Sequence, residues 1–532
     1  MEQHHGFESY FIEGEGLLGE SGDGRAGALE DVAADTPPFR FSRMGPSGAN
    51  RQLLDPNRAK IALAMTTAPA VQSQIPAGFT YLGQFIDHDL TFDKTPVTLG
   101  QFVTPAQLVQ NRSPSLDLDS LYGAGPTDPE SAKFYEADGL HLKMGDTVAA
   151  FGDAGRPKTD LPRVGTGPNA AAKRTALIPD PRNDENLAVA QTHLAMIRFH
   201  NRVVDTLPAS TPAAQKFAKA RDTVVRHYQW MIRTDYLPRI CKKKPLDDVF
   251  KNGRKAFEVN APPTSVPTMP IEFSVAAFRL GHSMIRAAYE WNKNFQTSTQ
   301  VLGTLDFLFT FSGLSGDLGG NLKLPANWIA DFRRLYNFGE AGRADLVVPA
   351  AKGNRARRID TNLVNPLQRL PNQTLGLPAN TPDTDPHRNL AFRNLTRARM
   401  VKLATGQQML QFLKSKGAVM TGLTKAQIRD GQGGASLDNL TGTQRDALLK
   451  NTPLWFYILR EAELNSGKLR GVGGRIVAET FHRAMEGSTS SIVRDPAWRP
   501  TLGPNSNTFR MVDLLLFAFE GKKNLLNPLG GN

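Results

Sequence analysis

The sequence has little of what several classes of protein require. One cysteine, Cys241, in 532 residues excludes an intramolecular disulfide framework. No apolar run approaches the roughly 20 residues that a membrane-spanning helix needs. Residues 1–16 contain four acids, no Lys or Arg and no apolar core, unlike a secretory signal peptide. We therefore expect no transmembrane segment and a protein that is cytoplasmic or non-classically secreted.

Charge is unevenly distributed along the chain. The formal net charge is +12, yet residues 1–36 carry nine acids and one Arg, a net of −8, which leaves +20 for the remainder. A segment with this much positive charge attracts anions or nucleic acid. The basic runs Lys242–Lys244 and Arg355–Arg358 are short, however, and no aromatic residues alternate with them. We interpret them as solvated faces and predict no nucleic-acid binding.

The hydrophobic pattern predicts a mostly helical protein. Apolar residues recur three and four apart over five stretches: Asn186–Leu207, Ala214–Leu237, Val275–Asn292, Gly406–Lys416 and Thr443–Ser466. Long Pro- and Gly-rich connections run over 123–181 and 345–386, and alternating strand patterns are scarce. We predict an acidic flexible tail over 1–36 and a single large helical domain with long irregular loops over 37–532.

A first polar constellation lies within the apolar helical pattern of Tyr81–Leu90. Asp87, His88 and Asp89 follow one another, so their side chains point about 100° apart on a helix. Gln84 lies four residues before His88 and shares its face. Alone, this pattern is as typical of a solvated helix end as of a functional site, although the neighbouring residues are mostly apolar.

Here the sequence resembles the animal-type haem peroxidases of the peroxidase–cyclooxygenase superfamily, including their bacterial members. Their distal helix has the pattern Gln-x-x-Asp-His-Asp, which is found here at residues 84–89. The resemblance implies that His88 is the distal acid–base catalyst and that Gln84 lines a halide or water site. It also implies that Asp87 forms an ester to a methyl group of haem b and that Asp89 binds calcium.

A second motif, over 113–123, alternates hydroxyls and carboxylates. Alternate side chains of an extended loop face one way, which suits the about six to eight oxygen ligands of Ca²⁺. Alone, a turn with Asx capping explains the pattern better, and the loop is not an EF-hand. With the first motif it resembles the family's calcium loop, which implies the ligands Asp89, Ser113, Ser115, Asp117 and Asp119. Asp119 stands where relatives often have Ser, and its added charge is not expected to weaken the site.

A third motif, Asp180-Pro-Arg-Asn-Asp-Glu, has the Pro and acids of a helix start. Arg182 and Glu185 lie three apart, which alone is also the spacing of a surface ion pair. The resemblance makes Arg182 the distal arginine, which stabilises charge on the departing oxygen, and Glu185 a second haem ester. Asn186 stands where some members have a Met bonded to a haem vinyl group, so we do not expect chloride oxidation.

A fourth motif contains a lone His in the apolar stretch Val275–Ile285, where a core histidine is commoner than a ligand. The pattern Phe-Arg-x-Gly-His at 278–282 resembles the family's proximal helix and implies that His282 ligates the haem iron. The stretch 390–399 resembles the segment whose Asn partners that His. Asn394 is therefore expected to accept the Nδ1 proton of His282, and Arg397 to bind a haem propionate.

The resemblance places Arg279 with the haem-binding residues. Arg279 also distinguishes peroxidases from the dioxygenases of the same superfamily. It stands three residues before His282, where cyclooxygenases and fatty-acid dioxygenases need a radical-bearing Tyr. The resemblance, over about residues 39–522, includes a stretch at 453–480 that looks like bacterial members. It implies a calcium-binding haem peroxidase that reduces hydrogen peroxide and oxidises bromide, iodide, thiocyanate or phenolic donors through an oxyferryl intermediate.

Two other functions stay open at this point. A fatty-acid dioxygenase of the same superfamily is disfavoured by Arg279. A non-catalytic haem- and calcium-binding adhesion protein is disfavoured by the joint presence of Gln84, His88 and Arg182, because peroxide chemistry needs all three. His193 and His200, seven apart on one helix, and the single Cys241 are interpreted as packing residues.

Overall fold

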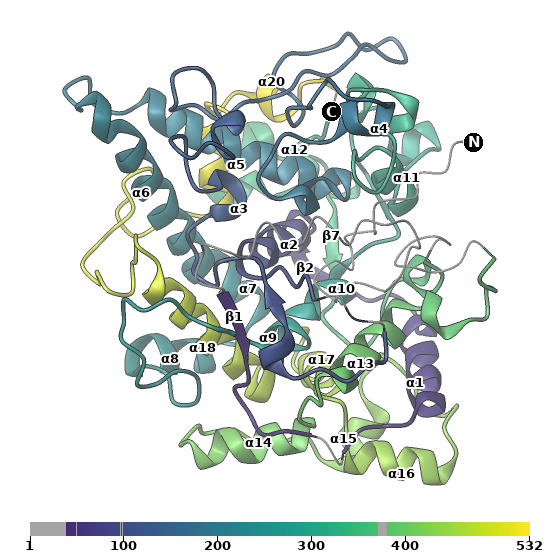
Figure 1. The fold of residues 1–532 in the computed structure, drawn as a ribbon. Coiled ribbons are helices and arrows are strands. Elements are labelled where there is room, and N and C mark those ends of the chain that lie inside the picture. The colour runs from purple at the N-terminus through teal and green to yellow at the C-terminus, as the bar shows by residue number, and fades with distance from the viewer. Residues whose placement is uncertain (1–38, 49–50, 96, 98, 371–379, 532) are drawn as a thin grey trace.

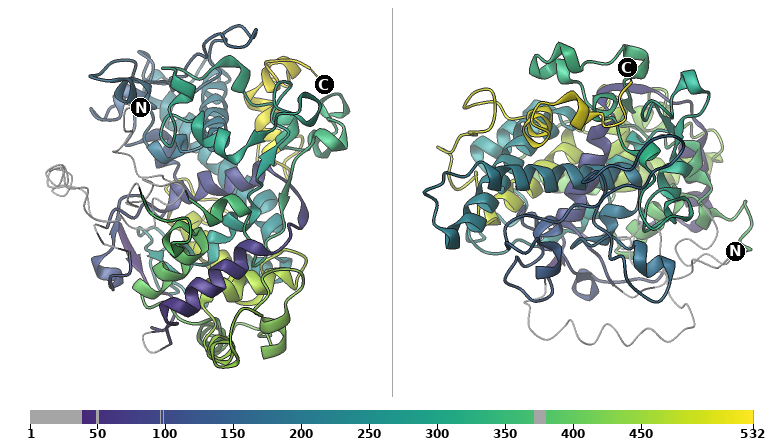
Figure 2. Two further views of the ribbon diagram at one scale, coloured as in Figure 1. Left: turned by 90° about the vertical axis from the view of Figure 1, so that its right-hand side faces the viewer. Right: turned by 90° about the horizontal axis from the view of Figure 1, so that it is seen from above.

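The computed structural model describes residues 39–48, 51–95, 97, 99–370 and 380–531. The acidic tail expected over 1–36 lies outside the described residues, and the two-part division of the chain stays a prediction. Helices dominate the described chain, which confirms the predicted fold class (Figures 1 and 2). None of its helices has both the length and the hydropathy that crossing a bilayer requires.

The α-helices are α1 (Asp55–Thr67), α2 (Gly78–Leu90), α3 (Asp119–Tyr122), α4 (Ala170–Arg174), α5 (Leu187–Asp205), α6 (Ala213–Met231), α7 (Leu237–Ile240), α8 (Lys243–Asn252), α9 (Ile271–Ser274), α10 (Gly281–Met284), α11 (Leu305–Thr310), α12 (Phe332–Leu335), α13 (Leu390–Met400), α14 (Gly406–Ser415), α15 (Lys425–Asp430), α16 (Gly442–Lys450), α17 (Leu454–Glu463), α18 (Gly471–Gly487), α19 (Met511–Ala518) and α20 (Lys523–Leu526). Short 3-10 turns include η4 (Pro181–Asp184) and η6 (Ala277–Leu280), and a π turn, η5 (Ile232–Tyr236), joins α6 to α7.

Strands are few and short in the described chain. They are β1 (Phe39–Ser42), β2 (Gln72–Pro76), β3 (Val109–Gln110), β4 (Met269–Pro270), β5 (Ala288–Tyr289), β6 (Gly303–Thr304) and β7 (Arg355–Arg357). They pair in the orders β3-β1-β4, β2-β7 and β5-β6. β1 runs antiparallel to β3 and parallel to β4.

Helix α2 lies in the middle of the molecule (Figure 1) and packs against α5 and α10. Eleven of its 13 residues are buried, as expected of a helix that is apolar on nearly every side. α5 in turn packs against α6 and α19. Helices α14 to α16 and α1 lie at the end of the molecule opposite α20 and the C-terminus (Figures 1 and 2). The first constellation is thereby placed in the core.

Two of the predicted helices are divided. The stretch 443–466 forms α16 and α17, because Pro453 stands between them and cannot continue a helix. The prediction of one helix over 275–292 is wrong: η6 and α10 occupy 277–284, and β5 follows at 288. Ala276, with φ −135° and ψ −69°, separates α9 from η6, and pairing with β6 extends the chain after Ile285. Tertiary contacts override the apolar periodicity there.

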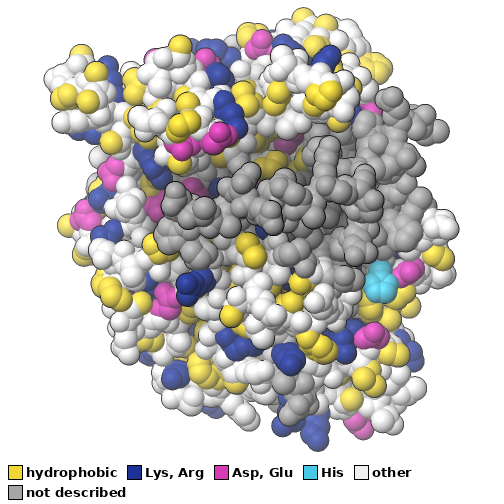
Figure 3. All heavy atoms as spheres, in the orientation of Figure 1, with side chains coloured by type: hydrophobic (Ala, Val, Ile, Leu, Met, Phe, Trp, Pro, Cys, Tyr) yellow, Lys and Arg dark blue, Asp and Glu magenta, His cyan; other side chains and the backbone are white. Residues whose placement is uncertain are grey.

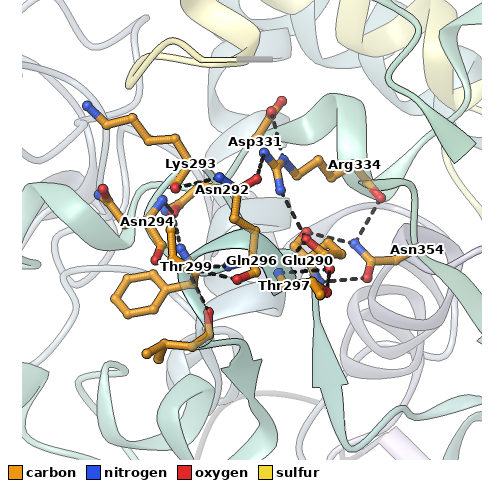
Figure 4. Close-up of polar contacts among 12 residues, drawn as sticks. Glu290, Asn292, Lys293, Asn294, Gln296, Thr297, Thr299, Asp331, Arg334 and Asn354 are labelled. Atoms are coloured by element: carbon orange, nitrogen blue, oxygen red, sulfur yellow. Dashed lines mark hydrogen bonds and ion pairs between the residues drawn. The ribbon is translucent and has the colours of Figure 1, made fainter. Parts of the chain in front are cut away.

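A polar network fixes the irregular chain that continues from β5 (Figure 4). Arg334 Nη2 donates to Gln296 Oε1 at 2.9 Å, and its Nε donates to Asp331 at 3.3 Å. Asn354 Nδ2 donates to the backbone oxygen of Glu290 at 2.9 Å. These contacts hold the segment 290–299 against α12 and against Asn354, the residue before β7.

Acidic, basic and apolar side chains are interspersed over the described part of the face in Figure 3. The single cysteine is buried, and burial raises the pKa of the Cys241 thiol. His193 and His200 are also fully buried. His193 packs edge-on against Phe85, and His200 Nδ1 lies 3.0 Å from the hydroxyl of Tyr122. All three residues are placed as packing residues, in keeping with their interpretation from the sequence.

Candidate functional site

A cavity between α2 and α10 brings His88 and His282 to opposite walls. Its empty volume is about 730 Å³, including the part open to solvent. The described residues that line it are Thr80, Tyr81, Gly83, Gln84, Asp87, His88, Thr91, Tyr236, Ser274, Phe278, Arg279, Gly281, His282 and Ile285.

The α2 wall follows from helical spacing. Gln84, Asp87 and His88 are three and four residues apart, so they project from one side of the helix, and Thr91 follows its last residue. Asn183 Oδ1, in η4, lies 2.9 Å from His88 Nδ1. With that oxygen as acceptor, Nδ1 carries the proton and Nε2 is the basic nitrogen. Burial, with the positive charge of Arg182, lowers the pKa of His88 to about 3, so the ring is neutral near pH 7.

Arg182 supports His88 from behind the cavity wall. Its Nη2 donates to the backbone oxygen of His88 at 2.9 Å and to Asp180 at 2.7 Å. Its guanidinium lies 4.0 Å from the centre of the Phe92 ring. Arg182 is fully buried and is not among the lining residues, and its Nη1 has no hydrogen-bond partner in the described chain. The structure therefore brings its charge beside His88 without exposing it to the cavity.

The two carboxylates expected to be bonded to haem lie in different settings. Asp87 lines the cavity, and burial raises its pKa to about 6 although Arg279 and Arg182 oppose this shift. Glu185 is fully buried at the end of η4 and is not among the lining residues. The structure brings only Asp87 to the cavity surface.

Asn186 has two structural roles that the sequence interpretation missed. Its Nδ2 donates to Gln84 Oε1 at 3.0 Å, and its Oδ1 accepts the backbone N–H of Val189, also at 3.0 Å. It is thus the N-cap of α5, which begins at Leu187 and not at Pro181. An Asn just before an apolar helical run is the usual signal for such a cap. Through Asn186 the start of α5 fixes the Gln84 side chain.

The opposite wall is built from short segments. His282 is the second residue of α10, and Asn394 Nδ2, from α13, lies 2.8 Å from its Nδ1. Arg279 Nη1 donates to Asn394 Oδ1 at 3.2 Å, and its Nε donates to the backbone oxygen of Ser274 at 3.0 Å. The Asn394 oxygen that was expected to accept from His282 thus accepts from Arg279. Iron ligation through Nε2 requires a proton on Nδ1, and the Asn394 oxygen must then turn towards it.

Burial, reinforced by the positive charge of Arg279, lowers the pKa of His282 to about 3. The neutral imidazole is the form that ligates metals. Beside it, Gly281 has helical φ and ψ of −54° and −34°. A Cβ added there would have no described heavy atom within 4 Å, so this position opens onto the cavity.

Arg397 lies elsewhere than the propionate assignment suggests. It is fully buried and forms an ion pair with Asp93, just beyond the end of α2. It is not among the residues that line the cavity. A propionate would have to reach this ion pair or draw Arg397 away from it.

The expected calcium ligands are brought together only in part. Asp89 accepts from the backbone N–H of Leu118 at 3.3 Å and from Ser120 Oγ at 3.1 Å. Burial and the neighbouring Asp119 raise the pKa of Asp89, because two carboxyls close together in a largely buried site resist ionising together. Asp119 Oδ1 is buried and has no hydrogen-bond partner among the residues described. This pair fits a bound cation, which would offset both charges.

The other expected ligands do not complete a shell. Asp117 Oδ1 accepts from Ser488 Oγ and from the backbone N–H of Thr489 at 3.2 Å, at the end of α18. The Ser113 backbone N–H donates to Asp119, and Ser113 Oγ accepts from the backbone N–H of Ser115. Over the described ranges, no group of three or more His, Cys, Asp or Glu side chains is arranged to hold a metal ion.

Comparison with known sequences decides the family. The animal haem peroxidase family model matches residues 90–370, more than half of the chain. The chain belongs to the animal haem peroxidase family. Mouse thyroid peroxidase is 28% identical over 209 residues, which cover 37% of this chain and 22% of that protein. Heme peroxidase 2 of Caenorhabditis elegans is 26% identical over 192 residues, which cover 35% and 25%. The chain thus spans about a quarter or less of the length of these two relatives.

Solved structures share the fold of this animal haem peroxidase family member. Peroxidase A from Dictyostelium discoideum gives a TM-score of 0.57 at 15% identity and covers 92% of this chain and 94% of that one. The Oryza sativa fatty acid alpha-dioxygenase gives 0.54 at 10% identity, over 89% and 81%. Because peroxidase and dioxygenase structures both match, the fold does not choose between the two reactions.

The cavity of this family member has the features that a haem needs. Neutral histidines stand on both walls, Gly281 leaves open space beside His282, and the half-buried carboxyl of Asp87 lines the cavity. His282 would hold the iron, and Asp87 could bond to the macrocycle. The residues present therefore fit the group that the family implies.

Several lining residues were missed by the sequence interpretation. Tyr81 donates through its hydroxyl to the hydroxyl of Tyr289 at 2.8 Å. Tyr81 lies seven residues before His88 on α2, so helical spacing alone could have placed it on the cavity face. Tyr236 comes from the π turn η5, for which the sequence has no comparable signal.

Proposed function

We propose that this protein is a haem peroxidase that reduces hydrogen peroxide and oxidises small anions or phenolic donors. The observation that carries the proposal is one cavity with His88 and its Asn183 contact on one wall, and His282 and its Asn394 contact on the other. Family membership supports the haem, and the neutral state of both rings supports their separate roles.

The roles of the side chains follow from their positions. Haem held through His282 would supply the electrons for O–O cleavage and would recover them from the donor. His88 Nε2 takes a proton from hydrogen peroxide and returns it to the departing oxygen. The positive charge of Arg182, held 2.9 Å from the His88 backbone, favours negative charge developing on that oxygen. Gln84, fixed by Asn186, positions water or a halide.

The finer assignments belong to the same proposal. We infer that Asp87 forms an ester with a haem methyl group, replacing one methyl hydrogen with hydrogen peroxide as the two-electron oxidant, and the exposure of Asp87 to the cavity supports this. The second ester at Glu185, the propionate contact of Arg397 and the calcium site rest on the resemblance, with the Asp89–Asp119 pair as support for calcium. Bromide, iodide, thiocyanate and phenols are the proposed donors, since Asn186 argues against chloride. Bacterial origin and the compartment stay predictions.

A fatty-acid dioxygenase is the second candidate, because the matched folds include one. Arg279 occupies the place where the dioxygenases need a Tyr, and it is held there by Ser274 and Asn394. We therefore expect no oxygen uptake with linoleate. Uptake that needs no reducing donor would favour the dioxygenase.

An absorption spectrum before and after one equivalent of hydrogen peroxide tests the proposal. We expect a strong Soret band that changes on addition of peroxide and recovers with a phenolic donor. No Soret band, even when haem is supplied during expression, would mean that His282 is an ordinary core histidine. A band unaffected by peroxide would indicate a haem carrier.

The position of the haem is tested by Gly281→Val. A side chain there would project into the cavity beside His282, so haem uptake should be lost while the fold is kept. Gly442→Val is the matched control, because Gly442 is also the first residue of a helix and has open space around it. Equal haem uptake by both variants would contradict the proposed haem site.

A further inference from the structure

A second cleft lies between α8, the loop after α14 and the start of α18. α8 and α18 pack against each other (Figure 1). The cleft has an empty volume of about 1,420 Å³, including the part open to solvent. Its charged lining residues are Lys242, Lys244, Asp248, Lys255, Arg470 and Arg475. It shares no lining residue with the cavity of His88 and His282.

Backbone contacts bring these basic residues together from distant parts of the chain. The Lys242 N–H donates to the Leu469 oxygen at 2.7 Å, and the Leu469 N–H donates to the Ile240 oxygen at 2.8 Å. This pairing holds Lys242 beside Arg470, the residue before α18. Arg470 Nη2 donates to the Thr421 oxygen at 3.3 Å and so links the third segment. The cleft is therefore fixed by the fold.

Arg475 provides a buried donor without an acceptor. Only 2% of this residue is exposed. Its Nε donates to Glu479 at 2.6 Å and its Nη1 pairs with Asp248. The buried Nη2 has no hydrogen-bond partner within the described residues. A buried donor on a charged group is costly when its hydrogen bond is not made, so a ligand acceptor at this position would be stabilising.

The cleft has more positive than negative charge. Asp248 also accepts from Lys255 Nζ at 3.0 Å, so Asp248 and Glu479 offset Lys255 and Arg475. The three remaining cations of the cleft are Lys242, Lys244 and Arg470. Across the part of the chain that is described, no ion pair joins any of them to an acid. A single carboxylate would leave most of this charge unmatched, whereas a phosphate is close to a dianion at neutral pH.

The helix end itself is not the source of the site. Glu461 already accepts the backbone N–H groups of Val472 and Gly473, the second and third residues of α18. The recognition must come from the side chains, and guanidinium groups match phosphate oxygens in geometry as well as charge. Ala418, Val419 and Met420 give the cleft an apolar wall beside Thr421. Val419 is 78% exposed.

We propose that this cleft binds a small organic phosphate. Its phosphate group lies among Lys242, Arg470 and Arg475, and its organic part lies against residues 418–420. The site is separate from the haem cavity and does not depend on the proposed peroxidase function.

Isothermal titration calorimetry on the purified full chain tests the site with phenyl phosphate and inorganic phosphate. We expect saturable one-to-one binding of phenyl phosphate, about tenfold tighter than inorganic phosphate because its ring buries apolar surface. The double variant Lys242→Gln/Lys244→Gln should weaken phenyl phosphate by about tenfold or more. Arg475 is left unchanged because its buried ion pairs support the fold.

Lys243→Gln is the matched control. Lys243 stands in the same basic run but pairs with Asp247 and does not line the cleft. We expect the Lys243→Gln protein to bind phenyl phosphate with the same affinity as the wild type. Absence of saturable binding, or equal weakening by the control and the double variant, would overturn the proposal. Equal affinity for the two phosphates would overturn the part assigned to the apolar wall.

Discussion

The two histidines face one cavity from walls of different construction. His88 stands on α2, an uninterrupted helix of 13 residues. His282 stands on α10, which has four residues and follows the equally short η6. The first wall is held by regular backbone hydrogen bonds. The second depends on side chains such as Arg279, which ties Ser274 to Asn394.

The difference indicates how each ring is oriented. His88 is oriented by helix geometry and by Asn183 in the turn η4, 95 residues along the chain. His282 is oriented by Asn394, which comes from α13, 112 residues along the chain. We expect substitutions near His88 to change chemistry with little effect on haem retention, and substitutions near His282 to change haem retention first.

The largest expected effects come from replacing each of the two histidines. His88→Ala removes the proposed general base and should slow the reaction with hydrogen peroxide by about 10²–10⁴-fold while haem content is kept. His282→Ala should lose haem. Stopped-flow absorbance and haem quantification measure the two effects. A His88→Ala protein that reacts with peroxide at the wild-type rate would contradict the role of His88.

A smaller effect tests the partners of the two rings. Asn394→Ala should weaken haem binding or activity by about 10–100-fold, because the proximal ring loses its orienting contact. Asn183→Ala, the equivalent change beside His88, should leave haem affinity near that of the wild type. Haem titration of both proteins makes the comparison. If both variants lost haem equally, the two walls would not differ in the proposed way.

The pH dependence of stability tests the α2 wall through the titration of Asp87. Burial raises the pKa of Asp87 from 3.8 to about 6. Between these values the unfolded chain has lost the Asp87 proton and the folded protein keeps it. Stability of the haem-free protein therefore falls as pH rises from about 4 to about 6, and is constant above that for this group.

Asp87→Asn should remove this decline, which amounts to about 3 kcal/mol for a shift of about two pKa units. Urea unfolding of haem-free wild type and variant at pH 4, 5, 6 and 7 measures it. Parallel stability curves for the two proteins would show that Asp87 is not the titrating group. Because a haem ester would remove the ionisable carboxyl, the experiment uses protein without haem.

The smallest effect concerns the residue that joins α5 to the α2 wall. Asn186→Ala loses the N-cap and should lower the free energy of unfolding by about 1 kcal/mol. Asn186→Ser keeps a capping oxygen and adds no charge at this fully buried position, but it lacks the amide that donates to Gln84, so its stability should stay close to that of the wild type. Thermal unfolding compares the two. Equal destabilisation by both substitutions would show that the contact with Gln84, not the cap, stabilises the fold.

The sequence by itself determined the regular elements and the residues of the α2 wall. Helical spacing predicted α2, α5 and α14, and it placed Gln84, Asp87 and His88 on neighbouring positions of one helix. These features depend on hydrogen bonds and contacts between residues a few positions apart, and such contacts leave a periodic pattern.

Only the tertiary structure decided the second wall and the partners of the buried charges. It broke the predicted helix at 275–292, paired Arg397 with Asp93, and turned Asp117 towards the end of α18. Asn394 was named from the resemblance, but the competition of Arg279 for its oxygen was not foreseen. Each of these contacts joins segments far apart in the chain. Their choice depends on which polar groups are buried together, and neither spacing nor composition specifies that.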